Sequence, residues 1–138
     1  MIFYPAELLL RSPFCDATNF FTSSGRRRNF TGRKIHQWNP DALLMRTTPA
    51  ENNKIGKIIA RKANASLGRT TIVLPLKGLS MLDTPGGEFW WPEADRALFD
   101  GIKNNIGPHI KVMELDCHIN DTRFANILVR EFFKLTVN

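Results

Sequence analysis

Apolar residues along this chain form three short continuous runs, and each run is followed by a longer stretch with helical spacing. The runs are "DALLMR" (41–46), "TTIVLPL" (70–76) and "HIKVMELD" (109–116). Their length and composition predict β-strands. The second run is β-branched and apolar on both faces, which is typical of a strand that is buried on both sides in a parallel sheet.

The stretches that follow the runs predict helices within 47–68, 92–107 and 120–135, because their apolar residues recur every three or four positions. The helix faces expected to point inward comprise Ile55, Ile58, Ile59, Ala63 and Leu67 in the first helix, Ala94, Leu98, Ile102 and Ile106 in the second, and Phe124, Leu128 and Phe132 or Leu135 in the third. Strand and helix therefore alternate through most of the chain.

The first helix has clear boundary signals. Thr48 can cap it, Pro49 fits its first turn, and Glu51 completes a T-x-x-E capping box. Gly68 is expected to end it. Pro92 marks the first turn of the second helix in the same way.

Three successive βα units imply right-handed crossovers and a parallel sheet with helices packed over it. We therefore predict a Rossmann-like three-layer α/β sandwich with a mainly parallel sheet. The 138 residues, 43% of them hydrophobic, are enough for one domain, so we expect 1–138 to be a single α/β domain. Its core is 40–138, and the less regular segment 1–39 is predicted to hold strands near 2–10 and 34–38.

Composition changes this picture little. The net charge of +6 is concentrated in the loop 25–34, which predicts a solvated basic loop, with an anion or nucleic-acid contact as the alternative.

Cys15 and Cys117 follow no metal-binding spacing and are expected to be free thiols, Cys117 half-buried at a strand end. The chain contains neither an apolar stretch of membrane-spanning length nor a signal-peptide pattern, so we expect a cytoplasmic protein without a membrane partner.

In parallel α/β sheets, ligands bind beyond the carboxyl ends of the strands. Three connections, 46–48, 77–91 and 117–121, are expected to emerge there and to converge. The second is far longer than the usual βα connection of about 2–6 residues, and such loops are commonly functional.

The first connection is a candidate anion site. Thr47 and Thr48 open a helix whose first N–H groups are unpaired, and Arg46 adds a guanidinium suited to phosphate oxygens. The alternative is that Thr48 is only a cap and that Arg46 lies at the surface or in a salt bridge.

The second connection is a candidate ligand loop. Gly78, Gly86 and Gly87 allow positive φ and close backbone approach, Ser80 offers a hydroxyl, and Asp83 can hold magnesium or a ribose hydroxyl. The Walker pattern is absent, so an ordinary turn is the alternative. Phe89, Trp90 and Trp91 are expected to pack or to form a contact with another lobe, and an exposed tryptophan pair would fit a missing partner lobe.

The third connection, "CHIND", holds the candidate catalytic residues His118 and Asp121, since a histidine can act as acid, base or phosphate donor and a carboxylate can orient it or bind metal. Asn120 is a further candidate ligand contact. Equally, Asn120 and Asp121 can be helix caps and His118 a satisfied, half-buried histidine. We expect Arg46, Ser80, Asp83 and His118 to share one concave pocket.

The motifs "NPDALLMRTTPAEN", "LPLKGLSMLDTPGGEFWWPEADRALFD" and "HINDTRFA", preceded by "CDATNF", resemble the C-terminal lobe of an uncharacterised bacterial, fungal and plant family. That family includes the ATP-binding N-terminal region of the tomato mosaic virus resistance protein. The resemblance implies a two-lobed, often dimeric α/β protein with nucleotide bound near the lobe interface. The resemblance does not include that family's N-terminal lobe, so we expect a site shared between the lobes to be incomplete in this chain, and Trp91 stands where relatives usually have a smaller or acidic residue.

The sequence therefore favours a nucleotide-binding domain that regulates or supports a partner, with ATP and Mg²⁺ as candidate ligands and self-association expected. One alternative is an enzyme of unknown specificity whose active site is completed by the missing N-terminal lobe. Another is an interaction module that uses the basic loop and Trp90 with Trp91. Nucleic acid is the less favoured partner.

Overall fold

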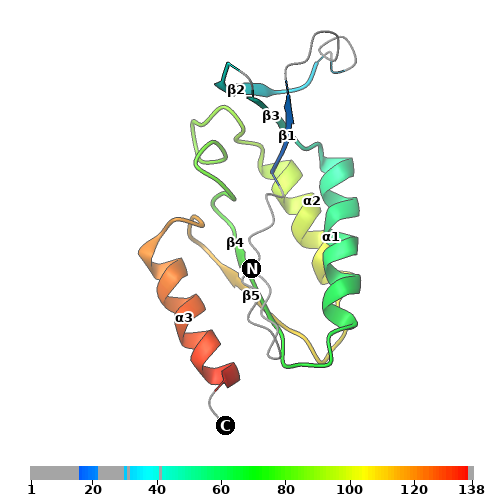
Figure 1. Cartoon of the computed structure of the whole chain (residues 1–138). Helices are drawn as coiled ribbons and strands as arrows, with labels where there is room; N and C mark the ends of the chain where they lie inside the picture. Colours follow the sequence, from blue (N-terminus) through cyan, green and yellow to red (C-terminus); the bar gives the residue numbers. More distant parts are fainter. Residues whose placement is uncertain (1–15, 22–29, 31, 41, 137–138) are drawn as a thin grey trace.

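The computed structural model describes residues 16–21, 30, 32–40 and 42–136. The elements, in chain order, are β1 (Ala17–Phe21), β2 (Ile35–Asn39), β3 (Ala42–Arg46), α1 (Pro49–Asn64), β4 (Thr71–Pro75), α2 (Pro92–Lys103), β5 (Lys111–Leu115) and α3 (Thr122–Thr136) (Figure 1). The strand expected near 2–10, Cys15 and the arginines at 26–28 lie outside the described residues.

The α/β class is confirmed, but the sheet differs from the prediction. β4 pairs in parallel with β5, from Thr71 opposite Lys111 to Pro75 opposite Leu115. β3 does not join them, because it lies between β1 and β2 in a separate antiparallel sheet. The expected sheet of three parallel strands is therefore wrong.

Burial explains why β3 and β4 behave differently. All five residues of β4 are buried, as a parallel strand between two helical layers requires. In β3, Leu43 and Met45 are buried while Ala42 and Leu44 are only half-buried. This alternation is typical of an antiparallel strand with one covered face.

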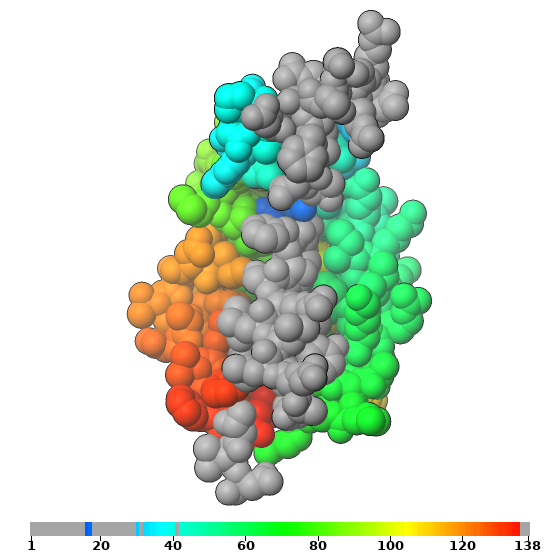
Figure 2. All heavy atoms as spheres, in the orientation of Figure 1, coloured from blue at the N-terminus to red at the C-terminus, as the bar shows by residue number. Residues whose placement is uncertain are grey.

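Helices cover both faces of the β4–β5 pair. Ile72 and Leu74 pack with residues of α1 and α2, including Leu98, in one apolar cluster. Val73, between them in sequence, points the opposite way and packs with α3, including Phe124. α1 and α2 therefore lie on one side of the pair and α3 on the other (Figure 1), and in the space-filling view α1 and α3 form opposite flanks of the molecule (Figure 2).

The capping box of α1 is confirmed. The Thr48 hydroxyl accepts a hydrogen bond from the Glu51 N–H at 3.3 Å, and the Glu51 carboxylate accepts one from the Thr48 N–H at 2.8 Å. The helix ends at Asn64, before the expected Gly68, and α2 begins at Pro92 as predicted. Local sequence signals therefore predicted the first residues of these helices more accurately than the last residues.

Cys117 follows β5 and is buried, more deeply than expected. Burial raises the pKa of its thiol, so the reactive thiolate is disfavoured. None of the helices in the described ranges is both long and apolar enough to cross a bilayer.

Gly56 allows α1 and α2 to approach closely, because a Cβ added there would lie 2.3 Å from the Leu98 carbonyl oxygen. We expect Gly56→Ala to lower the free energy of unfolding by about 2 kcal/mol through overpacking, although alanine is the better helix former by about 1 kcal/mol. Urea denaturation measures the change, with the exposed neighbour Lys57→Ala as the control. A gain in stability for Gly56→Ala would show that the helices are not in backbone contact there.

Candidate functional site

The connections after β4 (residues 76–91) and after β5 (residues 116–121) are hydrogen-bonded to each other at the carboxyl ends of the two strands. Lys77 N–H donates to Cys117 O, and Ile119 N–H donates to Gly78 O, both at 3.1 Å. The residues after β3 join them, since the Arg46 Nε donates to Phe89 O at 2.9 Å. The predicted convergence of the three connections is therefore confirmed, even though β3 belongs to another sheet.

Arg46 occupies the centre of this convergence and has no exposed surface. In addition to Phe89 O, it contacts Asp16 O and the Thr47 hydroxyl through Nη1, at 3.1 and 3.5 Å. Its Nη2 lies 2.6 Å from Asp95 Oδ1 and 3.3 Å from Asp83 Oδ1. A guanidinium has five N–H donors, and four hydrogen bonds to protein oxygens, together with the ion pair to Asp83, occupy the Arg46 side chain.

Two buried carboxylates, of Asp83 and Asp95, contact this one guanidinium, and the carboxylate of a third buried aspartate, Asp16, lies nearby against Ser80. Asp16, Asp83 and Asp95 are 1%, 0% and 5% exposed, and the Ser80 hydroxyl donates a hydrogen bond to the Asp16 carboxylate. We call Asp16, Arg46, Ser80, Asp83 and Asp95 the Arg46 cluster. It joins the start of β1, the end of β3, the 76–91 connection and α2.

Burial disfavours ionisation of the Asp83 and Asp95 carboxyl groups. It raises the pKa of Asp95 to about 7, the negative charge of Asp83 adds to the rise, and the hydrogen bond from Arg46 opposes it. Burial also raises the pKa of Asp83, against the nearby charge of Arg46. One guanidinium therefore does not compensate for the burial of these carboxyl groups.

Asp83 shapes the turn at 79–83. Its Oδ2 accepts from the Leu79 N–H at 3.1 Å, and its own N–H donates to Ser80 O at 3.1 Å. Asp83 is thus bound to the backbone and to Arg46, and it exposes no surface to a magnesium ion or a ribose. Among the residues that the structure describes, no three His, Cys, Asp or Glu side chains are placed to hold a metal ion.

Two glycines of the 76–91 connection have positive φ, as expected. Gly78 (φ +124°) is packed so closely that a Cβ would lie 1.8 Å from Asp83 O and 2.8 Å from a carbon of the His118 ring. Gly86 (φ +84°) has open space around it. Gly87 has no positive φ, but a Cβ there would lie 2.3 Å from Leu82 O, so it serves close backbone approach.

His118 is held by backbone groups through both ring nitrogens. Nε2 lies 2.9 Å from Ser80 O, and Nδ1 accepts from the Asn120 N–H at 3.1 Å. Because a carbonyl oxygen only accepts, this pattern assigns the proton to Nε2. The Asp121 carboxylate accepts from the His118 backbone N–H at 2.8 Å. The predicted catalytic pair thus has the geometry of a satisfied histidine and a local cap.

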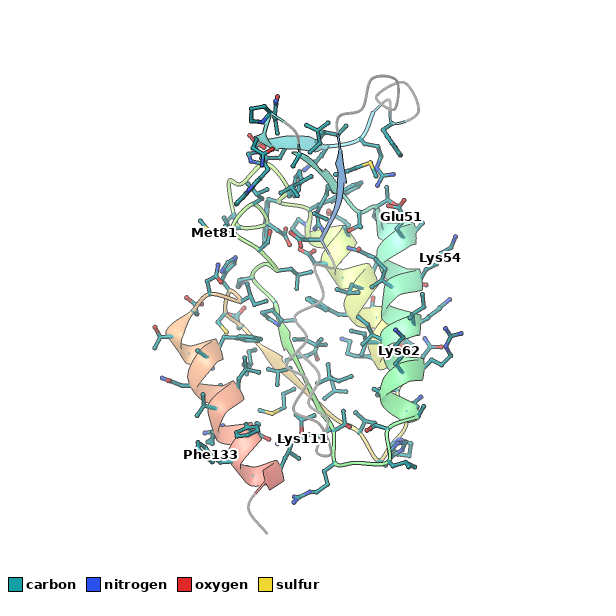
Figure 3. All side chains as sticks on the ribbon, in the orientation of Figure 1. Glu51, Lys54, Lys62, Met81, Lys111 and Phe133 are labelled. Atoms are coloured by element: carbon teal, nitrogen blue, oxygen red, sulfur yellow. The ribbon has the colours of Figure 1, made fainter. Side chains whose placement is uncertain are left out.

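The start of α1 already holds an anionic group. Beyond the capping box, the Glu51 carboxylate pairs with Arg33 at 2.8 Å (Glu51 is labelled in Figure 3). Burial opposes ionisation of Glu51, but hydrogen bonds from Thr48 prevail and lower its pKa. Thr47, the other candidate here, is buried. The geometry matches the alternative interpretation of Thr48 as a cap and Arg46 as a salt-bridged residue.

The aromatic end of the 76–91 connection packs against β2. Phe89 is buried, and Trp90 and Trp91 are half-buried, so no exposed tryptophan pair is present at these two positions. Lys34 donates to Trp90 O at 2.9 Å and lies 5.6 Å from the centre of a Trp91 ring. Lys34 and Arg33, expected in a solvated basic loop, are therefore engaged by the protein.

The four residues predicted to share one pocket do lie together, but they do not line an open pocket. Arg46 contacts Asp83, Asp83 is bonded to Ser80, and Ser80 O is bonded to His118. Since Arg46 and Asp83 have no exposed surface, the four side chains form a packed polar core and not an open cavity.

A cavity of about 350 Å³ lies beside this core. Its lining comprises Leu76, Pro92, Asp95, Arg96, Phe99, Asp100, Lys103 and Glu114. It meets the Arg46 cluster at Asp95 alone.

Sequence reasoning missed Asp16 and Asp95. Asp95 carried a usable signal, because it lies next to Ala94 and one turn before Leu98 and Phe99, on the apolar side of α2. A carboxylate at such a position needs a buried partner. Asp16 belongs to the "CDATNF" segment but had no predicted role.

Comparisons with known proteins confirm the family that the sequence motifs indicated. The family model described as the C-terminal domain of an uncharacterised protein family (UPF0261) matches residues 12–136. The chain is 40% identical over 133 residues to the ToMV resistance protein Tm-1(GCR237) of Solanum lycopersicum, covering 94% of this chain and 17% of the relative. It is 35% identical over 119 residues to UPF0261 protein RA0729 of Rhizobium meliloti (strain 1021), covering 85% of this chain and 30% of the relative.

A UPF0261 protein of Clostridium tetani (strain Massachusetts / E88) is 33% identical over 121 residues, which cover 87% of this chain and 30% of that protein. The chain thus spans less than a third of the length of these relatives.

Proposed function

The chain belongs to the UPF0261 C-terminal domain family, and from that premise we propose that it is a nucleotide-binding lobe, with ATP as the nucleotide, of a larger protein that regulates or supports a partner. Nucleotide binds across the 76–91 and 116–121 connections. The observation that carries the proposal is the hydrogen-bonded convergence of these two connections at the carboxyl ends of β4 and β5.

The backbone of the 76–91 connection makes the proposed contacts. Within the described part of the chain, the N–H groups of Met81 and Gly86 donate no hydrogen bond, and both residues are exposed. Figure 3 shows Met81 on the outer side of this connection. Unpaired backbone N–H groups can donate to phosphate oxygens. The Arg46 cluster, beneath them, fixes the shape of the connection.

The chain spans less than a third of the length of the tomato, Rhizobium and Clostridium relatives, which supports a nucleotide site formed by two lobes. We propose that the unit formed by β4, α2, β5 and α3 is Rossmann-like and that another lobe completes both its sheet and its nucleotide site. The tomato relative is named for resistance to ToMV, which is consistent with a role exerted on a partner. Self-association stays a prediction, which sedimentation analysis checks.

Calorimetric titration with ATP and magnesium tests the proposal, on this chain and on the whole Rhizobium relative. We expect both to bind, the relative more tightly, and Gly86→Ala to weaken binding to this chain about tenfold, or about 1.4 kcal/mol. Gly32→Ala is the matched control, since Gly32 has a similar φ of +81° and equally open space. Absence of binding heat from both proteins would remove the proposal.

A further inference from the structure

The Arg46 cluster contains more carboxyl groups than cationic groups. Asp16 contributes a carboxylate from the start of β1, Asp83 from the 76–91 connection and Asp95 from α2, whereas β3 contributes only Arg46. The nearby cations have other partners, because Arg33 pairs with Glu51 and Lys34 donates to Trp90 O. Ionisation of both Asp83 and Asp95 beside this single guanidinium would therefore leave buried negative charge uncompensated, which is strongly unfavourable.

Asp83 Oδ1 shows where a proton is needed. It is fully buried and has no hydrogen-bond donor among the described residues. Its contact with Arg46 Nη2, at 3.3 Å, is an ion pair without hydrogen-bond geometry, while the same nitrogen lies 2.6 Å from Asp95 Oδ1. The two carboxyl groups thus flank one nitrogen.

The Asp83 and Asp95 carboxyl groups are neighbours, because their Oδ1 atoms lie 3.3 and 2.6 Å from the same Arg46 nitrogen. Two ionised carboxylates are both acceptors and repel each other, so such a contact is favourable only if one of them carries a proton. A proton on Asp95 would supply the donor that Asp83 Oδ1 lacks.

We propose that Asp83 and Asp95 share one proton, which fastens the 76–91 connection to α2, and that loss of this proton loosens the connection. Asp95 lines the 350 Å³ cavity, which gives the buried pair a path for proton exchange with solvent. The effect on folding is independent of ligand binding. An effect on nucleotide affinity rests, in addition, on the proposed function.

The sign of the pH dependence follows from the proton count. The ordinary pKa of an aspartate is about 3.9, and that of Asp95 is raised to about 7. Between these values the folded chain binds more protons than the unfolded chain, so stability falls as pH rises. Above about pH 7 this contribution is lost.

Asp95→Asn tests the proposal, because an amide can accept from Arg46 and donate to Asp83 at every pH. We expect the urea midpoint of the variant to exceed that of the parent chain by a small margin near pH 4.5 and by a larger margin near pH 8.5, because the unfolded parent gains from ionisation of Asp95 above about pH 4. Asp100→Asn is the matched control on α2, where Asp100 lines the same cavity and its carboxylate, 47% exposed, is 3.7 Å from Lys103. It should shift the midpoint equally at both pH values.

Carbon NMR of the parent chain tests the proposal without any variant. We expect one carboxyl carbon of the Asp83–Asp95 pair to titrate near pH 7, and hydrogen exchange at 78–88 to speed up about tenfold across that titration, after correction for the intrinsic rates. Ordinary titration of both residues near pH 4 would overturn the proposal. So would equal pH dependence of the parent chain and Asp95→Asn. A titration near pH 7 without nucleotide binding would sustain this inference and remove the proposed function.

Discussion

Replacing Arg46 by methionine should lower the free energy of unfolding by about 3–5 kcal/mol or prevent folding altogether. The substitution leaves Asp83 and Asp95 buried without their cation, and it removes the donors that bind Phe89 O and Asp16 O. An isolated buried charge is among the most destabilising features that a single substitution can create. The loss should grow as pH rises and the carboxyl groups ionise.

Urea denaturation at neutral pH measures this loss, with Arg33→Met as the matched control. Arg33 also pairs with a carboxylate, but its side chain is 20% exposed and its partner Glu51 is 44% exposed. We expect the control to cost about 1 kcal/mol or less. Equal losses for the two variants would show that Arg46 is not the centre of a buried network.

Gly78→Ala should have the second largest effect, a loss of at least about 3 kcal/mol, because two costs add. A φ of +124° is strained for any residue with a Cβ, and this Cβ would lie 1.8 Å from the Asp83 carbonyl oxygen, which belongs to the backbone and cannot move alone. The substitution therefore forces the turn at 79–83 apart and displaces Asp83 from Arg46.

Gly86→Ala separates the two costs, since Gly86 shares the positive φ but has open space around it. We expect Gly86→Ala to cost about 1 kcal/mol. Thermal unfolding of both variants gives the comparison. If Gly78→Ala were no worse than Gly86→Ala, the close contact between Gly78 and Asp83 would not exist in solution.

Much of the fold could be predicted because its signals are local. The continuous apolar run of β4, the proline at the start of α2 and the capping box of α1 each act within a few residues, and each is found as predicted. The placement of β3 could not be predicted, since it depends on pairing with β1 and β2, and the Ala17–Phe21 strand was not recognised.

The residues that lie together at the site could be predicted from the sequence, but the direction in which their side chains point could not. Carboxyl ends of parallel strands meet at one edge, which correctly brought Ser80, Asp83 and His118 together. Whether such side chains face a ligand or each other depends on residues from distant segments. Here Asp16 and Asp95 complete the network around Arg46 and turn it inward. The sequence can therefore indicate which residues form a polar cluster, but it does not indicate which of their hydrogen-bonding atoms remain unpaired.

This arrangement assigns different tasks to side chains and backbone. The Arg46 cluster fixes the 76–91 connection, and exposed backbone groups on that connection are left for the nucleotide in our proposal. His118 fits the same division, because both of its ring nitrogens are bonded to the backbone. Acid–base chemistry by His118 would require at least one of these bonds to break.

Amide chemical-shift mapping of this chain with ATP and magnesium tests the account most directly. We expect shifts confined to 78–88 and 117–121, with the amides of α3 unchanged beyond its first turn. Shifts centred on α3 or on the outer face of α1, or no shifts at saturating nucleotide, would contradict it.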